Sequence, residues 1–310
     1  SQSRNMSNPF LRFEDGKISL GGKDLLVSSA NLSISPSFQV ERVYGDYDPD
    51  LVGAKTEFIN FAPMTGLNGK LDISFYISAE SFNREGGINS IERLFEIKGG
   101  MSEDPIHSNV VGRFSFDNMY LTSFSFELQP FKIVKASASY IIYGSIRKNP
   151  SRRFVQLGAN FAHGLKSFGQ IKIGGAAVNP SSFEKFEINS LNYKIIVDRK
   201  LHTKIRESEN TSINTFPDGV LPYRVSVESI ESEMNVQCND IVSSLNSYGD
   251  QQLGSSPEGL QDSEICAFLY SAKGERVAKF SSRGKIQSES ISITEGSNAS
   301  CNIYINEIIK

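Results

Sequence analysis

Gly16-Lys17-Ile18-Ser19-Leu20-Gly21-Gly22 returns later in the chain as Gly169-Gln170-Ile171-Lys172-Ile173-Gly174-Gly175. Each stretch reads as a short strand that ends at a double glycine, and such a pair marks a turn. A single match of this kind can arise by chance. Further matches follow in the same order, so the pair of stretches indicates that the chain repeats itself.

Two more segments of the first half recur in the second half. Val27–Ile34 matches Ile188–Ile195, and Ala136–Ile142 matches Ala299–Ile305. The displacement along the chain is nearly the same each time, since Gly16 corresponds to Gly169, Val27 to Ile188 and Ala136 to Ala299. Loop insertions account for the small drift. The sequence therefore predicts two copies of one fold, placed head to tail.

The length of 310 residues suits two domains of ordinary size, and 39% of the residues are hydrophobic. We expect a first domain over residues 1–150, with a flexible arm at 1–9, and a second over residues 151–310. The basic segment around Ser145–Arg153 reads as the linker between them. Gly249–Asp262 reads as a polar insertion found only in the second copy.

The charge and hydropathy exclude some classes of function. The net charge of −3 argues against a dedicated nucleic-acid binder, which must neutralise phosphates. We find neither a run of about 18 apolar residues nor a signal-peptide pattern, and therefore expect no membrane insertion. The three cysteines, Cys238, Cys266 and Cys301, show no Cys-x-x-Cys spacing, so we expect buried free thiols in a reducing compartment.

Most patterned segments alternate apolar and polar residues, as strands with one packed face do. In one segment Leu71, Ile73, Phe75 and Ile77 alternate with polar residues and Tyr76. In another, Phe124, Phe126 and Leu128 alternate with Ser123, Ser125 and Glu127. The predicted fold class is mainly β, with two tandem antiparallel β-sandwich or half-barrel domains.

One short helix is expected in each copy. Ile88–Lys98 keeps helical spacing, begins with a capping-box pattern and ends at a double glycine. Ile241–Leu245 follows the capping residues Asn239 and Asp240, and Gly249 ends it. Each copy therefore reads as two strands, a long loop, a strand, a helix and closing strands.

The long loops carry the candidate contact residues. We place one loop at Val43–Asn68 and the other at Lys204–Pro222, and loops of this length in compact domains are often functional. Phe58–Met64 has no evident strand partner, and exposed aromatic residues and methionine are typical of interfaces, although these side chains could instead fold back onto their own domain. The candidate residues for contacts between subunits or rings are Tyr44, Tyr47, Phe58, Ile59, Phe61, Met64, Ile213 and Phe216.

Catalytic and metal-binding patterns are missing from the sequence. His107, His163 and His202 are far apart, and no nucleophile elbow, phosphate loop or dinucleotide fingerprint occurs. Asp46–Glu57 resembles a calcium loop but has Leu51 where the turn needs glycine. We therefore assign no catalytic, cofactor-binding or metal residue and predict that the chain is not an enzyme. The basic cluster Arg147, Lys148, Arg152 and Arg153 is interpreted as a solvated linker.

The order of elements resembles the tail-tube fold of tailed bacteriophages, which contractile-injection tubes and baseplate hub rings share. The residues that carry the resemblance are Leu26–Tyr44 as a first hairpin, the following loop, Leu71–Ile77, the helix Ile88–Lys98, and Gly112–Phe116 with Leu121–Gly144. Leu121–Phe126 and Ala136–Tyr140 look like the closing hairpin of such proteins. Ile286–Ile293 and Ala299–Ile305 are its counterpart in the second copy.

The resemblance implies a structural virion protein that is assembled in the host cytoplasm and has no cofactor. In that family six domains per ring build a continuous barrel around a channel, and a long loop reaches the neighbouring ring. Two domains per chain would give a homotrimer ring with pseudo-sixfold symmetry. The implied partners are further copies of the chain, other tail proteins of the virion, and DNA that passes through the channel without specific binding.

Alternatives remain open at this point. The chain could be the repeating tube subunit or a specialised ring, such as a hub or a tube end, and the insertion at Gly249–Asp262 favours the specialised ring. A capsid decoration or neck protein would have no channel. A tandem β-sandwich that binds a glycan or host surface would need an aromatic platform, which the absence of tryptophan disfavours.

Overall fold

The computed structural model describes most of the strands expected from the sequence. The residues that it describes are 18–35, 38–42, 59–63, 68–78, 103–148, 161–173, 176–177, 188–202, 224–238, 256, 262–297 and 300–308. Within these ranges the chain forms antiparallel strands and turns, and no α-helix. The fold is therefore mainly β, as the sequence predicts.

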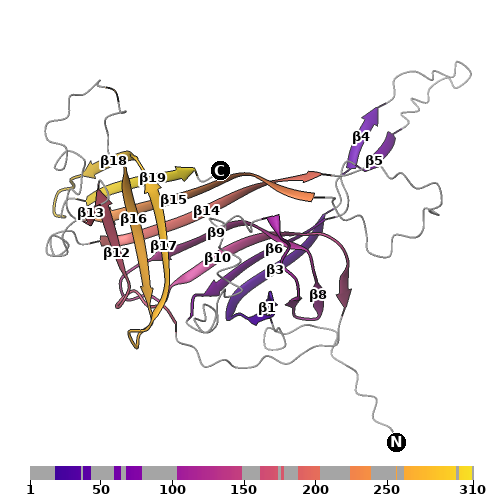
Figure 1. Cartoon of the computed structure of the whole chain (residues 1–310), viewed down its shortest axis with the longest axis horizontal. Helices are drawn as coiled ribbons and strands as arrows, with labels where there is room; N and C mark the ends of the chain where they lie inside the picture. Colours follow the sequence, from indigo (N-terminus) through magenta and orange to yellow (C-terminus); the bar gives the residue numbers. More distant parts are fainter. Residues whose placement is uncertain are drawn as a thin grey trace, which may run out of the picture.

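The largest sheet, which we call the long sheet, has eight antiparallel strands in the order β18-β19-β15-β14-β9-β10-β6-β3 (Figure 1). Its strands are β3 (Val27–Ser35), β6 (Asn68–Tyr76), β9 (Met119–Leu128), β10 (Lys135–Ile142), β14 (Ile188–His202), β15 (Arg224–Cys238), β18 (Ile286–Ser292) and β19 (Ser300–Ile308). The sheet runs through both halves of the chain.

Two smaller sheets and one hairpin complete the described structure. One small sheet has the order β11-β8-β7-β1-β2 and the other β13-β12-β16-β17. Their strands are β1 (Ile18–Leu20), β2 (Lys23–Asp24), β7 (Asn109–Val111), β8 (Phe114–Phe116), β11 (Ile146–Lys148), β12 (Phe168–Ile173), β13 (Ala176–Ala177), β16 (Ser263–Tyr270) and β17 (Arg276–Gly284). The hairpin pairs β4 (Phe38–Arg42) with β5 (Ile59–Pro63).

The strand order of the first half recurs in the second half. In the long sheet, β9-β10-β6-β3 corresponds to β18-β19-β15-β14. In the small sheets, β8-β7-β1-β2 corresponds to β17-β16-β12-β13, and β11 is an addition to the first. The two groups of four strands in the long sheet meet where β9 pairs with β14.

The double glycine of the repeat forms a tight hairpin turn. Leu20 pairs with Lys23, and both Gly21 (φ 60°) and Gly22 (φ 80°) have positive φ between them. Two residues with positive φ are the requirement of the type I′ turn, which glycine satisfies without steric cost. In the second half Ile173 pairs with Ala176 across the other double glycine.

Burial follows the alternation of the sequence. Leu71, Ile73 and Phe75 of β6 are buried, and so are Phe124 and Phe126 of β9. The intervening residues point to the opposite face, as the period of two in a strand requires. This part of the sequence-based interpretation is confirmed.

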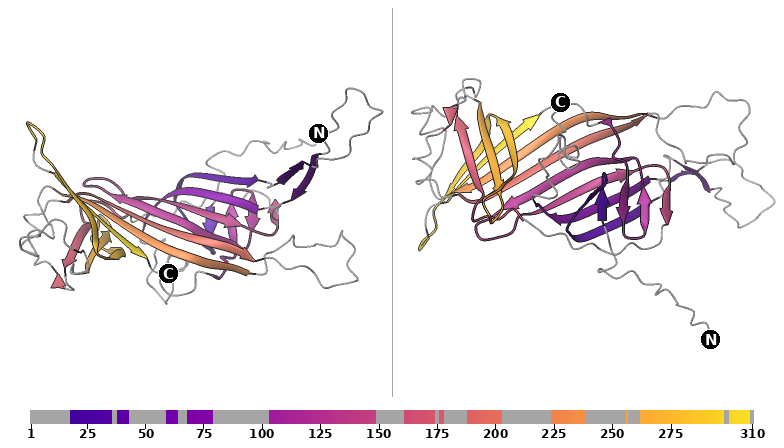
Figure 2. Two further views of the ribbon diagram at one scale, coloured as in Figure 1. Left: turned by 90° about the horizontal axis from the view of Figure 1, so that it is seen from above. Right: turned by 60° about the horizontal axis from the view of Figure 1, so that its bottom comes forward.

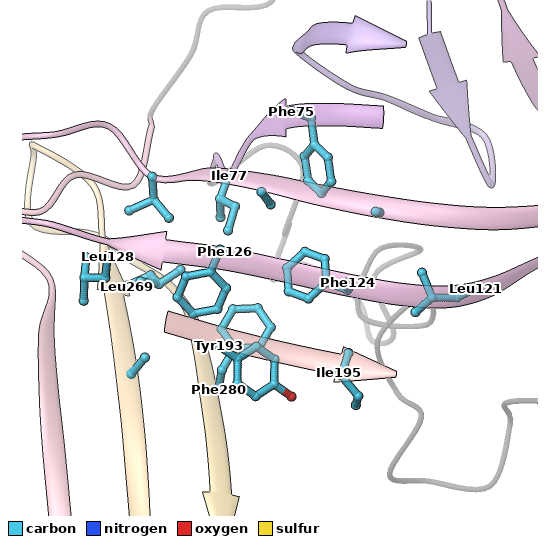
Figure 3. Packing of buried hydrophobic residues seen from close by; sticks show 14 of the residues in the cluster. Phe75, Ile77, Leu121, Phe124, Phe126, Leu128, Tyr193, Ile195, Leu269 and Phe280 are labelled. Atoms are coloured by element: carbon cyan, nitrogen blue, oxygen red, sulfur yellow. The ribbon is translucent and has the colours of Figure 1, made fainter. Parts of the chain in front are cut away.

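The buried apolar residues of both halves join in one main cluster. Phe280 of β17 lies 4.8 Å from Phe126 and 5.6 Å from Phe124 of β9, measured between ring centroids. It also lies 5.2 Å from Tyr193 of β14 (Figure 3). Aromatic pairs at these distances add to the stability given by buried area. The small sheet of the second half therefore packs over the junction between β9 and β14.

Three expectations about local structure were wrong. Leu26–Tyr44 is not a hairpin, because β3 pairs with β6 and β4 pairs with β5. The segment Val43–Asn68 is not all loop, since Ile59–Pro63 within Phe58–Met64 forms β5, and its partner strand is β4. Ser145–Arg153 is not all linker, because β11 pairs with β8. In each case many residues separate the two paired strands in the sequence, so local patterns do not reveal the pairing.

Several predicted segments lie outside the described residues. They are the arm 1–9, the helices Ile88–Lys98 and Ile241–Leu245, the loop Lys204–Pro222, the calcium-like loop Asp46–Glu57 and nearly all of Gly249–Asp262. These interpretations stay predictions.

Candidate functional site

The long sheet has one apolar face and one mostly polar face. The apolar face carries the buried cluster and packs against the small sheets. Serine and amide side chains recur on the other face from strand to strand; among them are Ser29, Asn31, Ser125, Ser137, Asn235 and Asn302. The sequence left open which face could line a channel, and the strand register now distinguishes the two faces.

The polar face is hollowed across its middle strands, next to the connection between β9 and β10. A shallow cavity of about 720 Å³ lies over β6, β10, β9, β14, β15 and β19. Its lining includes Ser74, Ser137, Asn192, Asn235 and Tyr304. The cavity spans strands from both halves, so the polar face is one continuous surface.

Charges on the polar face have both signs and lie close to one another. Glu127 lies opposite Lys135 on the neighbouring strand, and Glu233 lies opposite Lys194. Lys70 forms an ion pair of 3.3 Å with Asp72 on the same strand. Because lysines and carboxylates alternate, this face offers no extended positive stripe of the kind that holds a phosphate backbone.

The junction of the two halves is stabilised beyond its strand pairing. Arg199 of β14 donates from Nε to the carbonyl oxygen of Leu121 on β9 at 2.6 Å, and its guanidinium lies 5.4 Å from the Tyr120 ring centroid. Burial lowers the pKa of Arg199, while burial raises the pKa of Tyr120. Arg224 adds a bidentate ion pair with Glu103, the shortest distance being 2.7 Å.

The long sheet ends in two edge strands. Within the described part of the chain, β3 pairs only with β6, and β18 pairs only with β19. Apolar side chains are exposed on both edges: Ile34 is 52% exposed, Ile291 44% and Ile293 80%. Unpaired edges with exposed apolar residues are prone to pair with another chain.

In the sequence, the predicted contact residues fall between β4 and β6 or between β14 and β15. Ile59 and Phe61 belong to β5. Tyr44, Tyr47, Phe58, Met64, Ile213 and Phe216 lie outside the described residues. The β4–β5 hairpin and the β14–β15 hairpin point to the same end of the molecule (Figures 1 and 2). The sequence predicts a strand at Ile286–Ile293 but does not single out Ile34, Ile291 or Ile293, because their exposure at the sheet edges depends on the strand order.

The histidines and cysteines are dispersed. His202 contacts Ser226 Oγ at 2.8 Å on the neighbouring strand, and His163 accepts a 3.2 Å hydrogen bond from the backbone N–H of Leu165. The three cysteines are buried thiols that form no disulfide with one another, as predicted. No described residues form a cluster of three or more potential metal ligands. None of the described segments is a helix long and apolar enough to span a membrane.

Comparisons with known proteins give no family. No protein-family model matches the chain, and no curated protein matches it. The candidate site is therefore interpreted from the repeat, the strand topology and the two faces of the long sheet.

Proposed function

We propose that this protein is a non-enzymatic structural protein of a bacteriophage tail, in which three copies form a ring around a channel for DNA. Each chain would contribute two tube-like domains, so that the ring has threefold symmetry and a sixfold appearance. The proposal builds on the resemblance of the sequence to tail-tube proteins and on the topology of the long sheet.

The repeated strand order of the long sheet is the observation that carries the proposal. Inside the chain, β9 of the first half pairs with β14 of the second half. The counterpart of β9 is β18, and the counterpart of β14 is β3, and these two strands are the edges of the sheet. The two edge strands of the long sheet are therefore the counterparts of the two strands that pair with each other in its middle.

Such a contact is heterologous, because the two paired surfaces differ. Heterologous contacts form closed rings when the rotation between neighbours permits, and open filaments otherwise. Closure would also pair both edge strands of the long sheet, which removes the risk of uncontrolled strand addition at those edges. These two arguments favour a ring over a monomer with two exposed edges.

The polar face of the long sheet suits the wall of a DNA channel. Ser125, Ser137 and Asn235 offer hydrogen bonds to water, and the nearby lysines are matched by carboxylates. A wall that neutralised many phosphates would hold the DNA. A polar wall with mixed charge lets DNA pass, which agrees with the net charge of −3.

The hairpins at one end of the molecule suit contacts with the next ring. The β4–β5 pairing continues the β3–β6 pairing beyond the long sheet, and β14 pairs with β15 up to His202 and Arg224. Stacked rings would place these hairpins against a neighbouring ring or another tail protein, and Tyr44, Tyr47, Phe58, Ile59, Phe61, Met64, Ile213 and Phe216 are the candidate contacts.

Electron microscopy of the purified protein over a range of concentrations tests this proposal. We expect rings or tubes with a central hole and a sixfold outline, with a mass of three chains per ring. A compact particle without a central hole, as expected for a capsid decoration protein, would contradict the channel. Monomers at every concentration would contradict the proposal as a whole.

A further inference from the structure

The two free edges of the long sheet can be aligned with the pair of strands that meets inside the chain. The alignment uses the partners that each strand already has. This inference rests on the proposed ring, and it adds the residues and the register of the contact between neighbouring chains.

β18 can be aligned with β9 residue by residue. Phe124 of β9 lies opposite Ala138, and Ile291 of β18 lies opposite Cys301. Ala138 and Cys301 occupy the same place in the repeat, because Ala136–Ile142 matches Ala299–Ile305. Ile291 is therefore the counterpart of Phe124, and, two positions further on, Ile293 is the counterpart of Phe126.

β3 can be aligned with β14 in the same way. Both strands have an irregular register at the same place in the repeat, between Val27 and Ser29 in β3 and between Ile188 and Ser190 in β14. Val27 and Ile188 are also the first residues of the matching segments in the sequence. The counterparts of Tyr193, Lys194 and Ile195 in β14 are then Leu32, Ser33 and Ile34 in β3.

The register between β9 and β14 inside the chain predicts the register between their counterparts in neighbouring chains. In the β9–β14 pair, Phe126 lies opposite Tyr193, Ser125 opposite Lys194, and Phe124 opposite Ile195. We propose that β18 of one chain pairs antiparallel with β3 of a second copy in the same register, with Ile293 opposite Leu32, Ser292 opposite Ser33, and Ile291 opposite Ile34.

Burial supports this register. Phe124, Phe126, Tyr193 and Ile195 are buried where the two halves meet. Their counterparts Ile34, Ile291 and Ile293 are 52%, 44% and 80% exposed in the single chain. The proposed pairing places these exposed side chains in apolar cross-strand pairs, which stabilise a sheet.

The faces of the sheet also support the register. Ser33 and Ser292 belong to the polar face, as do their counterparts Lys194 and Ser125. A slip of one residue would place Ile291 and Ile293, the residue that follows β18, on the polar face. The proposed register instead continues both the polar face and the apolar face from chain to chain.

Cysteine cross-linking tests the register in the full-length protein. The double variant Ser33→Cys with Ser292→Cys is oxidised mildly, and the linked peptides are identified by mass spectrometry. We expect disulfide-linked dimers and trimers with loss of monomer on a non-reducing gel. The matched control is Ser29→Cys with Ser292→Cys, whose positions would be displaced along the strand by about 13 Å. The single variants detect links to the buried native cysteines.

The outcomes separate this inference from the proposed function, because rings are imaged in the same samples. A link at Ser33 and none at Ser29 supports the register. Rings with no link at Ser33 would overturn the register and leave the ring intact. So would rings in which the double variant Asn31→Cys with Ser292→Cys forms the efficient link instead. No ring and no link would overturn both.

Discussion

Arg199 Nε donates a hydrogen bond to the carbonyl oxygen of Leu121 at 2.6 Å, and this bond joins a strand of the second half to a strand of the first. The same guanidinium lies 5.4 Å from the ring centroid of Tyr120. Arg199 is partly shielded from water, so both interactions are stronger than they would be at the surface. These two interactions of Arg199 therefore connect the two halves next to the residues through which β9 pairs with β14.

Replacing Arg199 by alanine should destabilise the protein more than replacing Arg224, which is the matched control. The Arg224 side chain is 56% exposed and forms a surface ion pair with Glu103, so Arg224→Ala should cost less than about 1 kcal/mol. Arg199→Ala removes a charged hydrogen bond and a cation–π contact and should cost about 2 kcal/mol. Urea unfolding measures the loss in the free energy of unfolding for each variant. Equal losses would contradict a larger contribution of Arg199 to stability.

Tyr140→Phe should stabilise the protein. The Tyr140 hydroxyl is buried and has no hydrogen-bond partner among the described residues. Removing an unsatisfied buried polar group without changing the ring should raise the free energy of unfolding by about 1 kcal/mol at neutral pH. Chemical denaturation at pH 7 checks this, and a loss of stability would show that the hydroxyl is satisfied.

Alkaline pH should increase the advantage of Tyr140→Phe. Burial raises the pKa of Tyr140 well above its ordinary value of 10.0, and burial raises that of Tyr143 to about 12. Above pH 10 the tyrosines ionise in the unfolded chain while the buried ones stay neutral in the folded protein, so stability falls as pH rises. The wild type should therefore lose more stability than the variant between pH 8 and pH 11. Parallel losses would contradict the assignment to Tyr140.

Gly164→Ala should be far more damaging than Gly169→Ala. A Cβ at Gly164 would overlap the backbone carbonyl of Gln129, which cannot rotate away. A Cβ at Gly169 would lie 2.9 Å from Cδ1 of Ile188, the movable end of a side chain. Overpacking should cost about 3 kcal/mol at the first glycine and about 1 kcal/mol at the second. Thermal unfolding compares the two variants, and the reverse order would contradict the described backbone approach.

Ile293→Asp should prevent ring formation without unfolding the monomer. Ile293 is 80% exposed in the single chain, so its replacement should change monomer stability by less than about 0.5 kcal/mol. In the ring it would place a charge opposite Leu32. Phe131→Asp is the control, since Phe131 is 76% exposed but lies in the β9–β10 connection, away from both edges. Size-exclusion chromatography should show rings for the control only, and rings for both would contradict the proposed contact.

Added lysines on the polar face should make the ring retain DNA. Ser125→Lys with Ser137→Lys raises the charge of the cavity wall by two, whereas Ala272→Lys with Glu275→Gln makes the same change at exposed outer positions. We expect salt-dependent binding of an oligonucleotide in fluorescence anisotropy for the first variant, and weak binding for the wild type and the control. Equal binding by all three would argue against the polar face as the channel wall.

The local pattern of the sequence predicts strands well and their partners poorly. The alternation around Phe75 and Phe124 was sufficient to place β6 and β9 and their buried faces. The partner of β3 could not be deduced, because β4 and β5 intervene and the adjacent strand β6 begins only at Asn68. Pairing is decided by contacts far apart in the chain, which local periodicity does not contain.

The candidate surface was predicted even less completely. In the sequence, aromatic residues such as Phe58 and Phe61 are the stronger local signal for an interface. Ile34 and Ile291 look like ordinary strand residues in the sequence. Their exposure follows from being at the edges of a sheet, which only the strand order reveals.

Native mass spectrometry of the purified protein, combined with images of the same sample, is the sharpest test of the proposed ring. We expect a closed species of three chains with a central hole, formed by pairing of the two edges of the long sheet. A protein that stays monomeric at every concentration, or that forms only closed dimers without a hole, would contradict it.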